Sequence, residues 1–507
     1  MAGTKDILLG KIRGGMPMTG REQLQLSFLL SLPSILAQLS TILMQYIDAG
    51  MVGRLGAEQA AAIGLVSTTS WIFGGFCIAT SSGFTVQVAQ RIGAGDFAGA
   101  RSVMRKAFLS LLLFSGCLAL LGVAISPSLP RWLGGDPQLH ADASAYFAIH
   151  TAFLPTMQLC YTAGAMLQAS GNMKVPSLLN VTMCLLDVGF NYLFIYRLGM
   201  GVKGAAVGTG LAEIVTAAAM LWFLLVRSPE LNLRQDRCAA GDETDGVAAG
   251  EREAGGRGPC EPEADGRTKA RQRSFIPDED TLQTAFNICG PMWLQNLIMR
   301  GAYVMSTLIV APLGTVAIAA NSFAIIAESF CYMPGYGMEE AATTLVGQSI
   351  GARRKDLARR FAWITTGAGA LMMLSLAALM YAFAPQMMGL LTTDAEVIAL
   401  GAKVLRIEAF AELMYGVSIV AYGACVGAGD TLVPSVLNFG SMWVVRIGLA
   451  VLLTPAYGLV GYWVAMCVEL NVRGILFAWR IAGQNWLKKD ILSKEKKYIW
   501  KRQKRNV

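Results

Sequence analysis

Residues 169–180 read ASGNMKVPSLLN, and residues 427–438 read GAGDTLVPSVLN. The two stretches share a Val-Pro-Ser core and a closing Leu-Asn, and they lie 258 residues apart. At the same offset Gln90, in the stretch QRIGAGD, falls on Gln348, in the stretch GQSIGARR. A constant register over this length predicts that the two halves of the chain are repeats of one fold.

Long apolar runs dominate the composition. Of the 507 residues 54% are hydrophobic and 15% are charged, whereas soluble domains are about 45–50% apolar and about 25% charged. The runs reach ~20 residues or more, the length that spans about 30 Å of hydrocarbon. We therefore expect an all-α polytopic membrane protein with twelve transmembrane helices. The expected spans are residues 26–51, 58–84, 100–127, 142–167, 175–196, 204–226, 284–310, 316–342, 359–384, 399–425, 433–454 and 458–481.

A stretch rich in Gly, Ala and charged residues separates the sixth expected span from the seventh, and its composition is typical of a disordered linker. Six spans on either side make the halves parallel repeats related by an axis along the membrane normal. A duplication without mechanistic meaning remains the alternative. The expected parts are a cytoplasmic N-terminal segment (1–25), an N-lobe (26–227), a flexible cytoplasmic linker (228–280), a C-lobe (281–483) and a basic cytoplasmic tail (484–507).

The distribution of lysine and arginine predicts the orientation. Arg91 and Arg101 flank the loop between the second and third spans, and Arg353 and Arg359 flank its counterpart in the second half. Because short cytoplasmic loops carry an excess of Lys and Arg, we expect a multi-pass plasma membrane protein with both termini in the cytoplasm. The formal charge of +8 does not indicate nucleic acid, since the basic residues lie between apolar runs and at the ends.

Cysteine and histidine give no sign of a metal or catalytic cluster. The ten cysteines are scattered, mostly within apolar runs, and the chain has two histidines. No cofactor is therefore expected, and the expected partners are membrane lipid and a small amphipathic molecule. We expect the chain to be a monomer and not an enzyme.

Residues 44–56 read MQYIDAGMVGRLG and place Asp48 inside the first expected span. A carboxylate at the bilayer centre costs roughly 2.5–3.5 kcal/mol on insertion scales, so such a residue is a candidate functional residue. The alternative is that Asp48 lies near the helix end and reaches the membrane interface. Pro33, fifteen residues earlier and about 22 Å along the helix axis, predicts a kink in the same span.

Further polar residues occur in the same half. Asp187 and Asn191 are four residues apart on the fifth span and so share one helix face. With Asp48 and Thr209 they offer two carboxyl groups, an amide and a hydroxyl, which suit either Na⁺ coordination or proton uptake. The alternative is that Asp187 and Asn191 only hydrogen-bond to neighbouring helices. The remaining polar candidates of this half are Gln38, Gln45 and Asn180.

The second half does not repeat these carboxyl groups, because Ser306 and Val445 stand at the positions equivalent to Asp48 and Asp187. It has charges of its own, which we expect to face a cavity or to pair with each other. Arg300 and Arg446 are expected to pair with Glu408 or Glu412, and Glu213 and Glu469 are weaker candidates that can face the membrane interface. The other charged residues within the apolar runs of the second half are Glu328, Glu339 and Glu340.

The chain resembles the multidrug and toxic compound extrusion (MATE) family of cation-coupled efflux transporters across essentially all spans. The first-span stretch from Pro33 through Asp48 to MVGRLG carries the resemblance, together with QRIGAGD, GQSIGARR, GVKGAA and the repeated ASGNMKVPSLLN and GAGDTLVPSVLN. The resemblance implies a central cavity between two lobes that opens alternately to each side. It also implies export of organic cations, drugs or other amphipathic compounds in exchange for Na⁺ or H⁺.

The resemblance also implies which residues bind the coupling ion. The family uses an aspartate on the first helix, which Asp48 matches, and a threonine on the sixth, which Thr209 matches. The fifth-helix pair of the family is often Asn followed by Asp, and here the order is exchanged, with Asp187 before Asn191. These four residues are the expected ligands if the ion is Na⁺. On the seventh helix, where some members have an acid, this chain has Gln295 and Asn296, and the possible substitutes are Glu408 and Glu412.

Two other functions remain as alternatives. A flippase for lipid-linked precursors, from the same wider superfamily, would need a large and strongly cationic central cavity. A polytopic lipid transferase would need polar catalytic residues on ordered loops, and most loops here are short.

Overall fold

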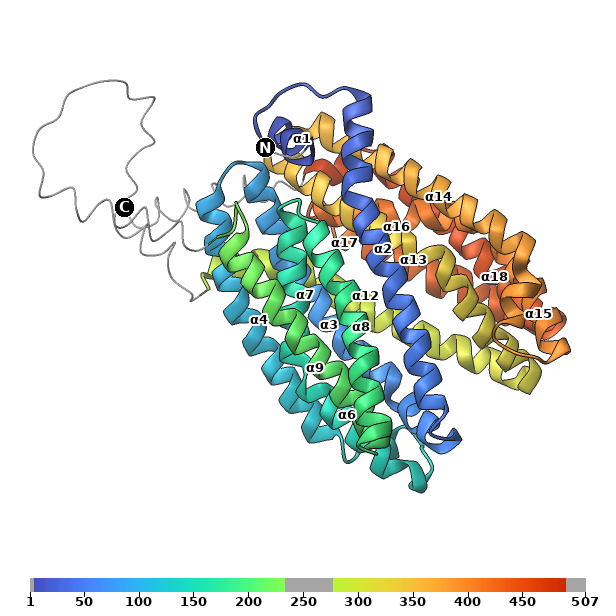
Figure 1. Ribbon diagram of the computed structural model, residues 1–507. Coiled ribbons are helices and arrows are strands. Elements are labelled where there is room, and N and C mark those ends of the chain that lie inside the picture. Colours follow the sequence, from blue (N-terminus) through green and yellow to red (C-terminus); the bar gives the residue numbers. More distant parts are fainter. Residues whose placement is uncertain (1–3, 233–276, 489–507) are drawn as a thin grey trace, which may run out of the picture.

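The structure of the chain is a computed structural model that describes residues 4–232 and 277–488 (Figure 1). Helices make up both halves, and no strand occurs in these two ranges. The elements of the first half are α1 (Thr4–Arg13), α2 (Gly20–Gly53), α3 (Ala57–Gly93), α4 (Phe97–Ile125), α5 (Leu129–Trp132), η1 (Pro137–Leu139), α6 (His140–Ala152), α7 (Leu154–Ala169), α8 (Lys174–Asn191), η2 (Tyr192–Arg197), α9 (Gly201–Trp222) and η3 (Phe223–Arg227). Those of the second half are α12 (Glu279–Val310), η4 (Ala311–Leu313), α13 (Thr315–Gly351), α14 (Lys355–Gly389), α15 (Ala395–Glu408), α16 (Glu412–Gly427), α17 (Leu432–Gly440), η5 (Ser441–Ile447), α18 (Gly448–Ala482) and η6 (Asn485–Lys488).

The helices account for the twelve expected spans. Within the described ranges nine segments are long and apolar enough to cross a membrane, and α15 with α16, bent by 59°, makes a tenth. The segments α6 and α7 together correspond to the fourth expected span. The twelfth span arises because α18 breaks at Gly458, which has a φ of 61° that favours glycine. After this break the chain reverses, so that Gly461 packs against the carbonyl of Leu453.

The linker prediction and the tail prediction fall largely outside the described ranges. Residues 233–276 and 489–507 belong to those two segments. The ends of the linker that are described follow η3 on one side and run into the first turn of α12 on the other, since residues 279 and 280 belong to that helix.

Side-chain caps define several helix starts. Thr19 and Glu22 form a capping box at the start of α2, and Asp96 accepts a hydrogen bond from the backbone N–H of Gly99 at the start of α4. Such caps satisfy backbone N–H groups that have no partner within the helix. These polar residues therefore help to fix where α2 and α4 begin.

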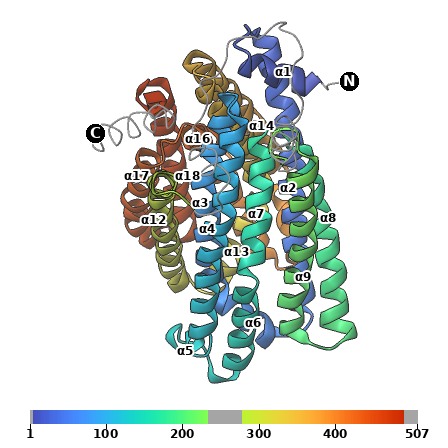
Figure 2. The ribbon, with the colours of Figure 1, turned by 90° about the vertical axis from the view of Figure 1, so that its left-hand side faces the viewer.

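The two halves form two lobes, and the first long helix of each lobe packs against the second long helix of the other. In Figure 1 the N-lobe helices α3, α4 and α6 to α9 lie apart from the C-lobe helices α14, α15, α16 and α18. The helix α2 packs against α13 of the other lobe, and its repeat equivalent α12 packs against α3. Figure 2 shows α4, α7, α8 and α9 running alongside one another in the N-lobe. The internal duplication is thus visible as a pair of equivalent contacts between the lobes.

One end of the molecule brings together Arg13, Arg91 and Arg354, and we call it the basic end. Here Arg13 at the end of α1 forms an ion pair with Glu230 (2.9 Å) and donates to the backbone carbonyl of Ser170. Arg354, between α13 and α14, donates to the carbonyl of Met16 at 2.7 Å. The helix α1 therefore contacts both lobes at this end.

Two equivalent glutamines join the lobes near the basic end. Gln348 of α13 donates a hydrogen bond to the carbonyl of Ala169 in α7 at 2.7 Å. Gln90 of α3 donates to the carbonyl of Gly427 in α16 at 3.2 Å. The two glutamine side chains are related by the repeat offset of 258 residues, and so are the two carbonyls that accept from them. The same contact is therefore made twice, once by each lobe.

Two equivalent glycines allow this close approach. A Cβ at Gly93 would lie 2.0 Å from the backbone oxygen of Gln348, and a Cβ at Gly351 would lie 1.8 Å from the backbone oxygen of Gln90. Any larger residue would push the helices apart. We call the two glutamines and two glycines the lobe lock.

Candidate functional site

Asp48, Asp187 and Asn191 form a buried polar cluster in the N-lobe. The amide nitrogen of Asn191 donates to Asp48 Oδ1 at 3.0 Å and to Asp187 Oδ2 at 3.1 Å. Asp187 and Asn191 are 1% and 2% exposed, and Asp48 is half-buried. Asp48 lies within the last two turns of α2, nearer to the helix end than the bilayer centre suggested by its sequence position. It is nevertheless bonded to α8 and is not a free interface residue.

The cluster has oxygen atoms available for a positive ion. The two carboxyl groups face one another, and the hydroxyl of Thr209 on α9 lies beside Asp187. Within the described ranges, Asp187 Oδ1 and Asn191 Oδ1 are buried without a hydrogen-bond partner. Buried polar atoms are normally paired, and carboxylate, amide and hydroxyl oxygens are the ligands that hard cations prefer. The same carboxyl groups can alternatively share a proton.

A glycine holds this cluster against α9. A Cβ placed on Gly208 would lie 2.1 Å from Asn191 Oδ1, and one on Gly204 would lie 2.8 Å from the backbone of Phe194. The small residues of the sequence GVKGAAVGTG therefore bring α9 close enough for Thr209 to reach Asp187.

The other polar candidates of the N-lobe lie outside the cluster. Gln45 is exposed, and Asn180 is half-buried on α8. Gln38 instead donates to Glu340 Oε1 of α13 at 3.1 Å. Gln38 therefore contacts the C-lobe rather than the Asp48 cluster, and a role for Gln45 and Asn180 stays a prediction. Pro33 lies inside α2, which continues through it.

The sequence did not indicate a second polar contact between the lobes. Glu340 accepts hydrogen bonds from Gln38 and, at 2.8 Å, from Gln168 of α7. Nothing in the spacing of Gln168 pointed to α13, since the contact depends on how the two lobes pack. Glu340 is half-buried, and the two amide donors satisfy its carboxyl oxygens inside the bundle.

In the C-lobe, the ionic pairing differs from the expected one. Arg446 donates to Glu469 Oε2 at 2.7 Å, and Arg473 donates to both carboxyl oxygens of Glu469. Glu469 is 0% exposed. The expected pairing of Arg446 with Glu408 or Glu412 is therefore wrong, as is the interfacial position suggested for Glu469. The i,i+4 spacing of Glu469 and Arg473 was the signal available in the sequence.

Glu408 and Glu412 are fully buried at the bend between α15 and α16. All four of their carboxyl oxygens lack a hydrogen-bond partner within the described ranges, although the Cys331 thiol lies beside Glu412. Arg300, expected near them, instead lies over the rings of Trp71 and Tyr303, with its guanidinium carbon 5.3 Å and 5.9 Å from the ring centroids. That contact is a cation–π interaction.

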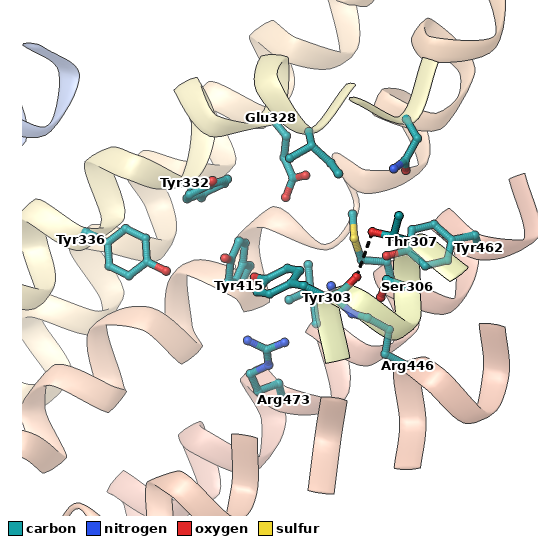
Figure 3. A pocket seen from close by; sticks show the side chains of 14 residues that line it. Tyr303, Ser306, Thr307, Glu328, Tyr332, Tyr336, Tyr415, Arg446, Tyr462 and Arg473 are labelled. Atoms are coloured by element: carbon teal, nitrogen blue, oxygen red, sulfur yellow. Dashed lines mark hydrogen bonds between the residues drawn. The ribbon is translucent and has the colours of Figure 1, made fainter. Parts of the chain in front are cut away.

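The cavity shown in Figure 3 lies inside the C-lobe, and it has a volume of about 170 Å³. Tyrosines surround it, with Glu328 on one wall and the paired arginines on another. The residues that line it come from α12, α13, α16, η5 and α18. The central cavity between the lobes stays a prediction.

Comparison with known proteins settles the family. The family model described as MatE matches residues 33–193 and 291–452, one copy in each lobe. The chain belongs to the MATE family. The two matched ranges contain Asp48, Asp187 and Asn191 of the N-lobe and Glu408 and Glu412 of the C-lobe, and the two copies follow the duplication seen in the sequence.

Relatives of this MATE protein cover nearly its whole length. The probable multidrug resistance protein NorM of Thermotoga maritima is 23% identical over 92% of this chain and 94% of its own. NorM of Pseudomonas aeruginosa is 28% identical over 89% of this chain and 88% of its own. A crystal structure of MATE in complex with MaL6 has a TM-score of 0.80 at 21% identity, covering 94% of this chain and 98% of that one. The predicted family and the twelve-helix, two-lobe fold are confirmed.

Proposed function

We propose that this MATE protein is a secondary active antiporter that exports organic cations, drugs or other amphipathic compounds in exchange for Na⁺ or H⁺. The observation that carries the proposal is the buried cluster of Asp48, Asp187 and Asn191. Two facing carboxyl groups joined by a single amide leave unpaired oxygens inside an apolar lobe. A positive ion would supply the missing partner, and its departure would expose the repulsion between the carboxyl groups.

The cluster also suggests how ion binding is coupled to transport. Asp48 belongs to α2, which packs against the C-lobe helix α13, whereas Asp187 belongs to α8 of the N-lobe. Ion or proton uptake would let α2 approach α8, with bending at Pro33, and so change the space available to a bound compound. The ion and the compound then favour different states of the lobes, which is the thermodynamic basis of exchange.

For Na⁺ the ligands would be the oxygens of Asp48, Asp187, Asn191 and Thr209, and for H⁺ the acceptors would be the two carboxyl groups. The protein would work as a monomer in the plasma membrane, without a cofactor and without catalysing a reaction. The basic end would face the cytoplasm because its loops carry the excess of Lys and Arg, and we propose that both termini are cytoplasmic.

Reconstituted vesicles test this function directly. A Na⁺ gradient and a pH gradient are imposed in separate experiments, and export of a fluorescent organic cation is followed for the wild type and for Asp48→Asn. The variant is expected to lose gradient-driven export. The exposed Glu58 at the start of α3 offers the matched control Glu58→Gln, which should export normally. Undiminished export by Asp48→Asn would refute the proposal.

The two alternatives receive less support. The buried arginines Arg446 and Arg473 are both bound to Glu469, so they do not supply the strongly cationic surface that a flippase for lipid-linked precursors needs. The relatives carry names of drug-resistance proteins, which favours transport over lipid transfer. Movement of a labelled lipid-linked precursor by the same vesicles would favour the flippase.

A further inference from the structure

The N-terminal helix α1 lies outside the two repeats. The matched family ranges begin at residue 33, whereas α1 ends at Arg13. It packs against α2 and α3 of the N-lobe and against α13 of the C-lobe. In Figure 1 it lies beside the start of α2, at one end of the bundle. The helix is therefore an addition to the duplicated frame, and it touches both lobes.

Arg13 attaches α1 to the N-lobe. Its guanidinium group forms an ion pair with Glu230 at 2.9 Å and donates a hydrogen bond to the carbonyl of Ser170 at 3.2 Å. The side chain of Leu9 packs against Gly171, where an added Cβ would lie 2.4 Å from it. These partners all belong to the first half of the chain, so the N-lobe holds one side of α1.

Arg354 attaches α1 to the C-lobe. It lies between α13 and α14, and its guanidinium group donates hydrogen bonds to the carbonyls of Lys11 at 3.1 Å and Met16 at 2.7 Å. Three apolar side chains of α1 are buried in a cluster to which α13, α14 and α16 contribute most residues. The three are Leu8, Leu9 and Ile12. The C-lobe therefore holds the other side of α1.

Both attachments lie close in the chain to one half of the lobe lock, the hydrogen bond from Gln348 to the carbonyl of Ala169. Ser170, which accepts from Arg13, directly follows Ala169, and Arg354 follows Gln348 by six residues. In this structure the lock is formed, so the lobes are closed at the basic end. If the lobes part here, Arg354 moves away from Ser170, and α1 cannot keep both attachments.

The contacts of α1 indicate which attachment breaks. The chain runs directly from α1 into α2 of the N-lobe, and Lys11 forms an ion pair with Glu22 of α2 at 2.5 Å. A helix of ten residues is only marginally stable on its own in water, so α1 has to stay packed on one lobe. We therefore expect it to stay on the N-lobe and to separate from Arg354.

We propose that α1 is a strap that holds the two lobes together at the basic end, and that opening at this end requires α1 to separate from Arg354. The strap stabilises the state that is closed at the basic end. Its consequence for export rests on the proposed function, because a compound enters from the basic end only after the strap has released the C-lobe. The conformational claim does not rest on that function, since it concerns the lobes alone.

Distances between spin labels on the two lobes test the strap in the purified full chain. In a background without native cysteines, labels are placed at Ala94→Cys of the N-lobe and Arg360→Cys of the C-lobe, both exposed positions. Pulsed electron paramagnetic resonance is recorded without a compound or an ion gradient. Arg354→Ala should raise the fraction of long distances at least threefold, and Arg13→Ala should do so from the other side. The control is Arg21→Ala, at an exposed position of α2, which should leave the distances unchanged.

A single label at Met16→Cys reports on the attachment itself. Met16 has an exposed side chain, and its backbone carbonyl accepts from Arg354. The mobility of this label should increase in Arg354→Ala, which shows that the variant has freed this part of the chain. The measurement therefore separates a strap that fails to release from a strap that releases without effect.

Three outcomes would overturn the proposal. The first is a mobile label at Met16→Cys in Arg354→Ala while the distances between the lobes stay as in the wild type. The second is unchanged distances in both Arg354→Ala and Arg13→Ala. The third is an equal increase of long distances in Arg21→Ala, which would assign the effect to loss of charge at the basic end. Normal export by Asp48→Asn would refute only the proposed function, because the distances are measured without transport.

Discussion

Asn191 links the two carboxyl groups of the N-lobe cluster. Its amide nitrogen donates a hydrogen bond to Asp48 of α2 and another to Asp187 of α8, so it holds carboxyl groups from two helices close together. Hydrogen bonds to charged groups contribute about 1.5–3 kcal/mol each, and a carboxylate within the membrane costs roughly as much. The amide therefore offsets the cost of burial without filling the remaining oxygen positions.

The exchanged order of the fifth-helix pair gives a prediction at this scale. If the set of ligands matters more than its order, the double variant Asp187→Asn with Asn191→Asp should keep gradient-driven export. Each single change should reduce export. Asp187→Asn removes a carboxyl group, and Asn191→Asp replaces the amide that donates to both acids with a third carboxyl group. Initial export rates from vesicles measure all three variants. A double variant as defective as the singles would show that the order itself is required.

Glu469 gives a second prediction about a single side chain. Glu469→Gln leaves Arg446 and Arg473 buried without a negative partner, and breaking a buried ion pair costs about 3–5 kcal/mol. We expect a marked fall in the thermal unfolding midpoint of the purified protein, measured in detergent. Glu396→Gln, at an exposed position on α15, should leave the midpoint unchanged. An unaltered midpoint in Glu469→Gln would mean that the arginines find other partners.

Single residues were predictable where chemistry alone marked them. Asp48, Asp187 and Asn191 stand out because carboxyl and amide groups are rare in apolar runs, and the structure brings them together. The partner of Arg446 was not predictable, since it depends on the rotation of two helices about their axes. Arg473 is one helical turn from Glu469, and that spacing is a sequence signal for the pair, although no pairing of Arg473 was predicted.

At the scale of elements, the long apolar runs predicted where the spans lie, but they did not predict where the helices bend or break. The bend between α15 and α16 and the break at Gly458 leave the expected spans 399–425, 433–454 and 458–481 in place. Hydropathy reports length but not direction, so it cannot indicate where a helix bends. The bend nevertheless has a consequence, because it is where Glu408 and Glu412 are buried.

The lobe lock yields a prediction for paired elements. Gly351→Ala would place a methyl group against the Gln90 carbonyl, and overpacking of this kind costs about 1–3 kcal/mol. The closed contact between α3 and α13 should then open more often. In a background without native cysteines, Ala169→Cys serves as a reporter, because its backbone carbonyl accepts the hydrogen bond from Gln348 of the lobe lock.

Alkylation of this reporter by a maleimide should be about 5–150-fold faster when Gly351→Ala is present, the range that 1–3 kcal/mol allows. The control is Gly367→Ala on α14, where a new Cβ meets no atom within 4 Å. Equal rates with and without Gly351→Ala would show that the lock does not hold the lobes together.

The whole molecule combines a symmetric frame with asymmetric chemistry. Contacts between the lobes repeat at a fixed offset, as in the pair Gln90 and Gln348. The carboxyl groups do not repeat, since Ser306 stands where the first half has Asp48. The duplication therefore predicted how the two lobes are arranged. The chemical difference between the lobes depends on residues such as Asp48 that occur in only one of the two repeats.

The most direct test of this account is whether the compound displaces the ion. Purified protein is loaded with Na⁺ in one experiment and held in weakly buffered solution in another, and the released Na⁺ or H⁺ is measured when an organic cation is added. We expect the wild type to release one of these ions and Asp48→Asn to release neither. Equal release by the wild type and the variant, or no release from either, would contradict the claim that the buried acids of the N-lobe couple ion and compound.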